Sequence, residues 1–299
     1  PNILIIKNNN KQTKLQKAKC LDADTVIKKY MNDLGQKVSI NSVKKYLTDI
    51  RDIFEKEKII FDDFPSDGSS WSVNKSIKSK KFNLAKKIFK ETLKSKDIVI
   101  RRGIVTGDNN VFIIDKKTKN SWVNEDKRCS NYIRPYLKGR DLENWKQKKI
   151  DNYIIYADRK FNISSAPKVI KNYLQKYKKQ LSDRTTVPAS HDWYQLMQPQ
   201  VGYINDFEKS KKIVWRDISS KCTSTIVESG VYLDATCFYI PIFDKALCSW
   251  MHSSFFLEYF KTISSSVRGE SLRWKKQWVE QMYFYPDELK KDLENIYDL

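Results

Sequence analysis

Apolar residues in this chain occur in short, separated segments, and this spacing limits the folds that the chain can adopt. Apolar runs such as Ile3–Ile6 and Val111–Ile114 have the length of a β-strand and fall far short of the roughly 20 residues that span a bilayer. The 299 residues are nevertheless 40% hydrophobic and 13% aromatic, which is enough for packed cores. We therefore expect a globular chain of about two domains without a membrane segment.

The predicted secondary-structure elements alternate irregularly along the chain. Helical spacing of apolar residues predicts helices over Leu84–Leu93, from near Ser165 to Leu181, over about Leu247–Ile263 and over Trp274–Met282. Short β-type segments are predicted at Ile98–Ile100, Val111–Ile114, Tyr153–Tyr156, Ile213–Trp215, Thr225–Val227 and Phe238–Phe243. Because no regular strand–helix–strand rhythm is present, we predict an α+β fold in which mixed small sheets pack against helices.

A segment rich in residues that break helices and strands, Phe64–Ser70, predicts a linker. We therefore expect two domains, residues 1–65 and residues 66–299. In the first, Ile3–Ile6 predicts a strand, and a returning strand is expected near Leu15–Leu21. Apolar residues between Val43 and Phe54 fall on one helical face.

The charge of the chain indicates the class of its partner. There are 56 Lys and Arg residues against 36 Asp and Glu residues, which gives a formal net charge of +20. Such an excess disfavours the compact state by self-repulsion, and chains of this kind commonly bind polyanions, so we expect a nucleic acid. The five cysteines are widely separated and no signal-peptide pattern is visible, so we expect reduced thiols and a cytoplasmic location.

The motifs of common catalytic sites are missing from the sequence. None of the eight glycines pairs with another at the spacing of a dinucleotide, methyl-donor or P-loop phosphate site. Neither GxSxG nor HExxH occurs, and His191 and His252 have no second ligand nearby. His252 lies in an apolar helical stretch, which favours a packing role. We expect no catalytic site, cofactor or metal in this chain.

The charge and the order of acidic and basic residues also fit two other classes of protein that act on or bind nucleic acid. A metal-dependent endonuclease places an Asp and an acidic-x-Lys triplet on adjacent strands to hold a divalent ion. Asp115, Glu125 and Lys127 have this order, although such triplets also arise by chance in a Lys-rich chain. The other alternative is a non-specific RNA- or single-strand-binding protein, which would use basic grooves and exposed aromatic rings.

Several blocks along the chain, in a fixed order, resemble one family. They are Arg102–Ile114 with its two glycines, Ile133–Leu142, Trp193–Leu196, Lys212–Trp215, and Leu247–Ile263 followed by Ser271–Lys276. They occur in order within about residues 66–285 and resemble the TaqI-like C-terminal specificity domain of adenine-specific DNA methyltransferases, which include type IIG restriction–modification enzymes. The resemblance implies a target-recognition domain that holds duplex DNA.

The same resemblance implies that the catalytic part of the enzyme lies outside this sequence. Residues 1–65 would be the end of the methyltransferase domain, and that domain would be the partner within the parent chain. The sequence contains neither an Asn-Pro-Pro-[Tyr/Phe] motif nor a methyl-donor glycine loop. S-adenosylmethionine would therefore bind the missing domain, and Mg²⁺ would be needed only if the parent also cleaves DNA.

The residues expected to contact DNA lie in three connections between predicted elements. Gly139 would permit a sharp turn that presents two cations to phosphates, whereas Gly103 and Gly107 are expected to be structural. The other two connections are the polar loop before Trp193 and the basic segment before and after Trp274. The candidates are Lys138, Arg140, Arg184, Thr185, Thr186, Ser190, Arg268, Arg273, Lys275 and Lys276.

Overall fold

The computed structural model describes residues 3–4, 18–21, 59–61, 88–185, 190–264, 266–267 and 271–299. The chain divides into two compact units, Pro1–Lys87 and Ile88–Leu299. The expected boundary between residues 65 and 66 lies outside the described residues. Within these described ranges, no helix is long and apolar enough to cross a membrane.

The described part of the first unit is a small antiparallel sheet. Its strands are β1 (Ile3–Leu4), β2 (Ala18–Leu21) and β3 (Ile59–Phe61). β2 lies in the middle and pairs with both neighbours. β1 and β2 confirm parts of the two predicted strands, whereas β3 was not predicted from the sequence. The predicted helix between Val43 and Phe54 lies outside the described residues.

A central antiparallel sheet of strand order β12-β10-β14-β4 organises the second unit. Its strands are β4 (Arg101–Arg102), β10 (Lys212–Arg216), β12 (Thr225–Val227) and β14 (Cys237–Ile240). Successive side chains of a strand point to opposite faces. Accordingly, Val214 and Tyr239 enter one hydrophobic core, and Trp215 and Phe238 enter another. The sheet is therefore covered by apolar side chains on both faces.

The core that contains Val214 is completed by a second sheet, of order β13-β6-β9-β5, in which β13 and β6 are parallel. These strands are β5 (Ile113–Asp115), β6 (Ile133–Leu137), β9 (Asn152–Ile155) and β13 (Tyr232–Leu233). The helices of this core are α4 (Asn109–Phe112), α5 (Lys116–Glu125), α6 (Lys168–Lys176), α7 (Lys178–Ser182) and α8 (Ile204–Glu208), with 3-10 turns η1 (Lys127–Asn131) and η3 (Val201–Tyr203).

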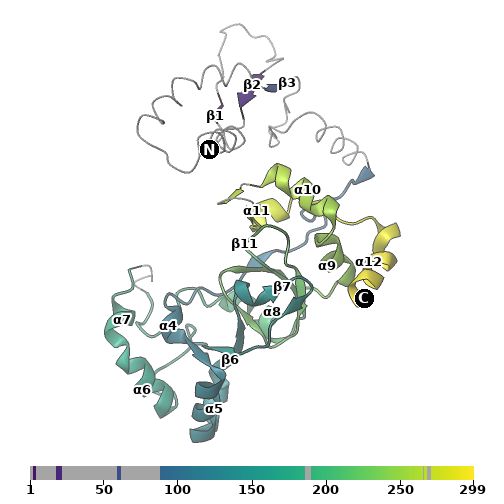
Figure 1. Cartoon of the computed structure of the whole chain (residues 1–299). Helices are drawn as coiled ribbons and strands as arrows, with labels where there is room; N and C mark the ends of the chain where they lie inside the picture. Colours follow the sequence, from purple (N-terminus) through teal and green to yellow (C-terminus); the bar gives the residue numbers. More distant parts are fainter. Residues whose placement is uncertain are drawn as a thin grey trace, which may run out of the picture. The chain divides into compact units, whose positions relative to one another are not determined.

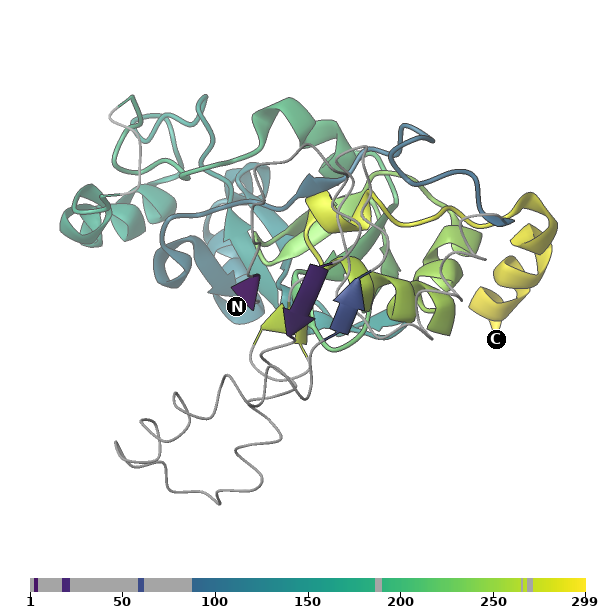
Figure 2. The same ribbon diagram turned by 90° about the horizontal axis from the view of Figure 1, so that it is seen from above.

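The core that contains Trp215 is built mainly by the last helices of the chain. These are α9 (Lys245–Met251), α10 (Ser254–Ile263), α11 (Lys276–Val279) and α12 (Lys290–Asp298), with η4 (Asp287–Leu289). A sheet of order β11-β16-β15 joins them, with β11 (Ile218–Ser219), β15 (Ser266–Val267) and β16 (Ser271–Arg273). Within this unit, α5, α6 and α7 lie at one end and α9 and α12 at the other (Figures 1 and 2).

Two of the predicted helices are each interrupted by a break. The segment from near Ser165 to Leu181 forms α6 and α7, which are separated at Tyr177. The segment Leu247–Ile263 forms α9 and α10, because Ser253 is extended and its Oγ accepts a hydrogen bond from the N–H of Phe256 at 3.1 Å. The apolar spacing continues across each break because both helices face the same core, so periodicity did not show the interruption.

Several other boundaries were also predicted wrongly. At Val111–Ile114 only the last two residues belong to strand β5, because Asp108 caps α4 through the N–H of Asn110 at 3.0 Å. Ile98–Ile100 is not a strand, and the helix predicted over Trp274–Met282 shortens to α11. Helix α5 was missed because only one of its ten residues, Trp122, is buried, which leaves almost no apolar stripe.

Candidate nucleic-acid interface

The turn that carries Lys138 and Arg140 is held from both sides by the body of the fold. It forms the 3-10 turn η2 (Gly139–Asp141), in which Asp141 Oδ2 accepts a hydrogen bond from the N–H of Lys138 at 2.9 Å. The N–H of Gly139 donates to Thr236 Oγ1 at 2.9 Å, and a Cβ on this glycine would lie 2.8 Å from that oxygen. The glycine was expected to permit a sharp turn; the structure shows that it is required for the close approach to Thr236, and Arg140 is exposed beside it.

The buried carboxylate of Asp234 holds Thr236, the residue that the η2 turn contacts. Asp234 is only 5% exposed, and its Oδ1 accepts hydrogen bonds from the N–H and the hydroxyl of Thr236 at 2.8 and 2.6 Å. Its Oδ2 accepts from the hydroxyl of Tyr136 at 3.1 Å. Burial, followed by the charge of Asp234, raises the pKa of the Tyr136 hydroxyl, so this phenol stays protonated and continues to donate. The turn is thus anchored in the core.

A second group of cations, in addition to Lys138 and Arg140, lies at the end of β16. Arg273 and Lys275 flank Trp274, which is fully buried and stacks on Phe260 with ring centroids 3.9 Å apart. The indole N–H of Trp274 donates to Ser219 O at 3.0 Å. Because side chains alternate along an extended segment, burial of the tryptophan directs Arg273 and Lys275 away from the core. Lys276 is exposed at the start of α11.

Backbone hydrogen bonds connect the two cationic groups. The N–H of Asp217 donates to Thr236 O at 2.9 Å, and Asp217 O accepts from the N–H of Trp274 at 2.8 Å. The structure thereby brings together cations that are far apart in the sequence. We call this set the basic edge; its members are Lys138, Arg140, Arg273, Lys275 and Lys276, with the two arginines described next.

Sequence reasoning missed two arginines of the basic edge. Arg102 is exposed at the end of β4, and its Nε donates to Ala235 O at 2.6 Å, within the segment that supports the η2 turn. Arg216 ends β10, and a guanidinium nitrogen donates to Leu142 O. Arg216 directly follows the apolar segment Ile213–Trp215, and Arg102 is the second of two arginines after Ile98–Ile100; this change from apolar to charged residues was the available signal.

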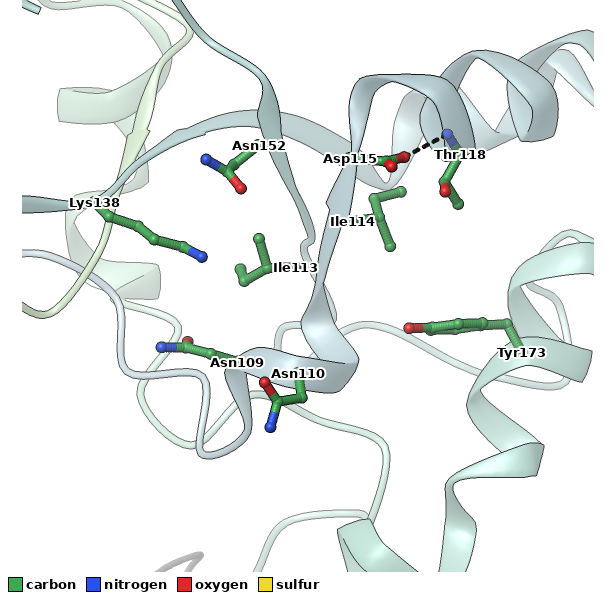
Figure 3. Close-up of a pocket in the computed structure, with 9 residues that line it drawn as sticks. All are labelled: Asn109, Asn110, Ile113, Ile114, Asp115, Thr118, Lys138, Asn152 and Tyr173. Atoms are coloured by element: carbon green, nitrogen blue, oxygen red, sulfur yellow. Dashed lines mark hydrogen bonds between the residues drawn. The ribbon is translucent and has the colours of Figure 1, made fainter. Parts of the chain in front are cut away.

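A hollow of about 420 Å³ opens beside Lys138 (Figure 3). Ile113 and Ile114 of β5 contribute apolar surface, and the ammonium end of Lys138 points into the space (Figure 3). The side-chain amides of Asn109, Asn110 and Asn152 also line the hollow. Amides and a lysine can contact phosphate and base edges, so the hollow extends the polar surface next to the basic edge.

Arg184, expected to contact DNA, donates its hydrogen bonds to the backbone of its own protein. Its Nη2 donates to Trp193 O and Gln195 O at 2.6 and 3.0 Å. Its Nε and Nη1 donate to Leu181 O and Thr106 O at 2.8 and 3.1 Å. Burial lowers the pKa of the guanidinium, but arginine stays protonated in proteins. The geometry supports a structural role, in which Arg184 holds the polar loop against the segment that precedes α4.

The other loop candidates are not brought to the basic edge by any contact in the described residues. Thr185 and Ser190 are exposed on the loop beside Arg184, and Ser190 Oγ lies 3.4 Å from Nδ1 of His191. Thr186 and Arg268 lie outside the described residues. These four residues remain predictions.

The residues of the alternative nuclease site lie at opposite ends of one helix. Asp115 caps the start of α5, and its Oδ1 accepts from the N–H of Thr118 at 2.7 Å; this hydrogen bond lowers the pKa of the carboxyl. Glu125 ends the same ten-residue helix, which at about 1.5 Å per residue separates the two by about 15 Å. Lys127 begins η1 beyond it. The two carboxylates therefore cannot hold one ion. Among the described residues, no group of three or more His, Cys, Asp or Glu side chains could hold a metal.

The fold and the basic edge define an α+β module that presents grouped cations at the ends of its strands. The structure of the chain resembles part of the structure of a larger enzyme, the type IIL restriction-modification enzyme MmeI, which was solved in complex with DNA. The TM-score is 0.51 at 12% identity, over 67% of this chain and 27% of that chain. The type IIG restriction endonuclease BpuSI matches with a TM-score of 0.45 at 15% identity, over 75% of this chain and 28% of that chain.

The family model described as the TaqI-like C-terminal specificity domain matches residues 134–282. This part of the chain is therefore a TaqI-like specificity domain, which confirms the resemblance and the predicted α+β fold class. The chain spans little more than a quarter of the two restriction enzymes that it matches. A search of curated proteins found no match.

Proposed function

We propose that this chain recognises duplex DNA as the specificity part of a type II restriction–modification enzyme. The observation that carries the proposal is that the match to a specificity domain, residues 134–282, contains most of the basic edge. Lysines and arginines on a rigid frame contact phosphates and position the duplex, while a few side chains read base edges. The MmeI structure is a complex with DNA, and this agrees with the proposed function.

The proposal includes a division of labour within a longer parent protein. An adenine-specific methyltransferase domain that binds S-adenosylmethionine would transfer the methyl group, and this chain would hold the duplex while the target adenine is flipped out. Residues 1–65 would be the end of that domain. If the parent also cleaves DNA, Mg²⁺ would serve its nuclease part. Such an enzyme acts on DNA in a bacterial cytoplasm.

A binding assay with matched variants tests the proposal. The purified 299-residue chain is titrated onto a fluorescent duplex pool, a single strand and an RNA, at several salt concentrations. We expect preference for the duplex and a steep loss of affinity with salt. The double variant Arg140→Ala/Lys275→Ala should reduce the slope of log affinity against log salt by up to about 2, because two phosphate contacts are removed.

The control is Lys117→Ala/Lys179→Ala, which removes the same charge from exposed positions on α5 and α7. We expect it to change the slope by much less. Equal losses in the two variants would show that the charge acts diffusely and would contradict the basic edge as the binding surface. Tighter binding to the single strand would favour the single-strand-binding alternative, and Mg²⁺-dependent nicking by this chain would favour a nuclease.

A further inference from the structure

Asp217 places a carboxyl group within the basic edge. It follows β10, and its backbone is fixed on both sides by the hydrogen bonds to Thr236 and Trp274. The positive charges that act on this carboxyl are those of Arg102 and Lys275. A carboxylate repels phosphate, so its presence here weakens general affinity for a polyanion. It therefore needs a reason other than phosphate binding.

The neighbouring carboxylates have structural duties, whereas Asp217 has none of this kind. Asp234 and Asp141 accept the hydrogen bonds that hold Thr236 and the η2 turn. In the part of the chain that the structure describes, no other residue donates a hydrogen bond to the Asp217 carboxyl or forms an ion pair with it. The carboxyl is half-buried and keeps unused acceptor capacity.

Desolvation makes this arrangement unfavourable in the free protein. Burial raises the pKa of the Asp217 carboxyl, while the charges of Arg102 and Lys275 oppose that rise. In the described part of the chain, the hydrogen bond indicated on this carboxyl comes from its own backbone N–H, so a donor on a ligand can still add a hydrogen bond. In the major groove the cytosine N4 amino group is the donor that Asp and Glu side chains accept from.

We propose that Asp217 is a specificity-determining residue that accepts a hydrogen bond from a cytosine N4 amino group in the major groove. The inference rests on the proposed duplex-binding function. In this arrangement Arg102 and Lys275 hold phosphates on either side of the base pair that is read. The rigid backbone of Asp217 limits the carboxylate to one base-pair position, so its effect on binding is confined to that position.

The test compares base preference at every position in wild-type protein, Asp217→Asn, Asp217→Glu and the control Asp183→Asn. Asp183 is an exposed acid at the end of α7. Duplexes bound from a random pool are sequenced. For the wild type we expect about a tenfold preference for cytosine at one position. Asp217→Asn should lose that preference, Asp217→Glu should keep part of it, and Asp183→Asn should keep it fully.

A second measurement leaves the protein unchanged and so does not depend on whether the variants fold. The preferred cytosine is replaced by a pyrimidinone analogue that lacks the N4 amino group, and wild-type affinity should fall by about the same tenfold. If Asp217→Asn binds all sequences more tightly by one factor, or if the wild type has no cytosine preference, the inference is overturned while duplex binding stands. Failure of the wild type to bind duplex DNA would instead overturn the proposed function.

Discussion

Replacement of Arg184 by methionine separates a structural role from a base-reading role. The change keeps an unbranched side chain but removes the four hydrogen bonds to Leu181, Thr106, Trp193 and Gln195. Hydrogen bonds to a charged group contribute about 1.5–3 kcal/mol each when buried. Because the guanidinium is partly exposed, half of the lower value applies to each bond, and four bonds of about 0.75 kcal/mol give a loss of about 3 kcal/mol of unfolding free energy.

Urea unfolding followed by tryptophan fluorescence measures this loss. With a slope of about 2 kcal/mol/M, the midpoint of Arg184→Met should fall by about 1.5 M, and Arg184→Lys should recover little because an ammonium cannot reach four carbonyls in this geometry. Where the variant is folded, the ratio of its affinities for different DNA sequences should equal that of the wild type. An unchanged urea midpoint combined with a relaxed base preference would refute the structural role.

Three further predictions concern the frame of the interface. Gly139→Ala places a Cβ about 2.8 Å from Thr236 Oγ1, so duplex affinity should fall more than it does in the control Gly202→Ala, which meets no atom within 4 Å. Burial lowers the pKa of Lys212 from 10.5 to about 8; the unfolded chain then binds more protons than the folded chain between these pH values, and stability rises with pH there, by at most about 3 kcal/mol. Between about pH 8 and pH 10.5 the urea midpoint of the wild type should rise relative to that of Lys212→Met. If the two proteins show the same dependence of midpoint on pH, the lowered pKa of Lys212 is contradicted. The buried thiols should resist a thiol reagent at pH 8 until the protein unfolds, which mass spectrometry of native and denatured samples can check; they are Cys129, Cys222, Cys237 and Cys248.

The fold class and the buried strands could be predicted from the sequence because they depend on local apolar pattern. β12 has the predicted bounds, Thr225–Val227, and β10 differs by one residue at each end. Helix breaks could not be predicted in this way, because α9 ends at Met251 and Ser253 caps the start of α10 without interrupting the apolar face. Helix α5 has nearly no apolar face, so its apolar spacing does not predict it. Its start is fixed by the N-cap Asp115, a residue that the nuclease alternative assigned to a metal.

The candidate site was predictable only in part. Lys138 and Arg140 were predicted because a glycine between two cations indicates a turn, and the structure places them at such a turn; their contact with DNA stays a prediction. Their proximity to Arg273 and Lys275 depends on hydrogen bonds through Thr236 and Asp217, and no local pattern encodes such long-range contacts. Arg184 shows the opposite case. An arginine in a polar loop has the same appearance in a sequence whether it faces a ligand or the backbone of its own protein.

The two-sided burial of the central sheet also bears on how strand β10 selects its alignment. A one-residue slip would exchange the faces of Val214 and Trp215, yet both would still be buried, so apolar burial alone distinguishes the alignments weakly. The two charged ends of the strand supply the distinction. Lys212 Nζ donates to Ser210 O and Glu228 O at 3.0 and 3.1 Å, and Arg216 bonds to Leu142 O at the other end. The hydrogen bonds of these two cations therefore fix the register, because a slipped strand would leave both charges without these partners.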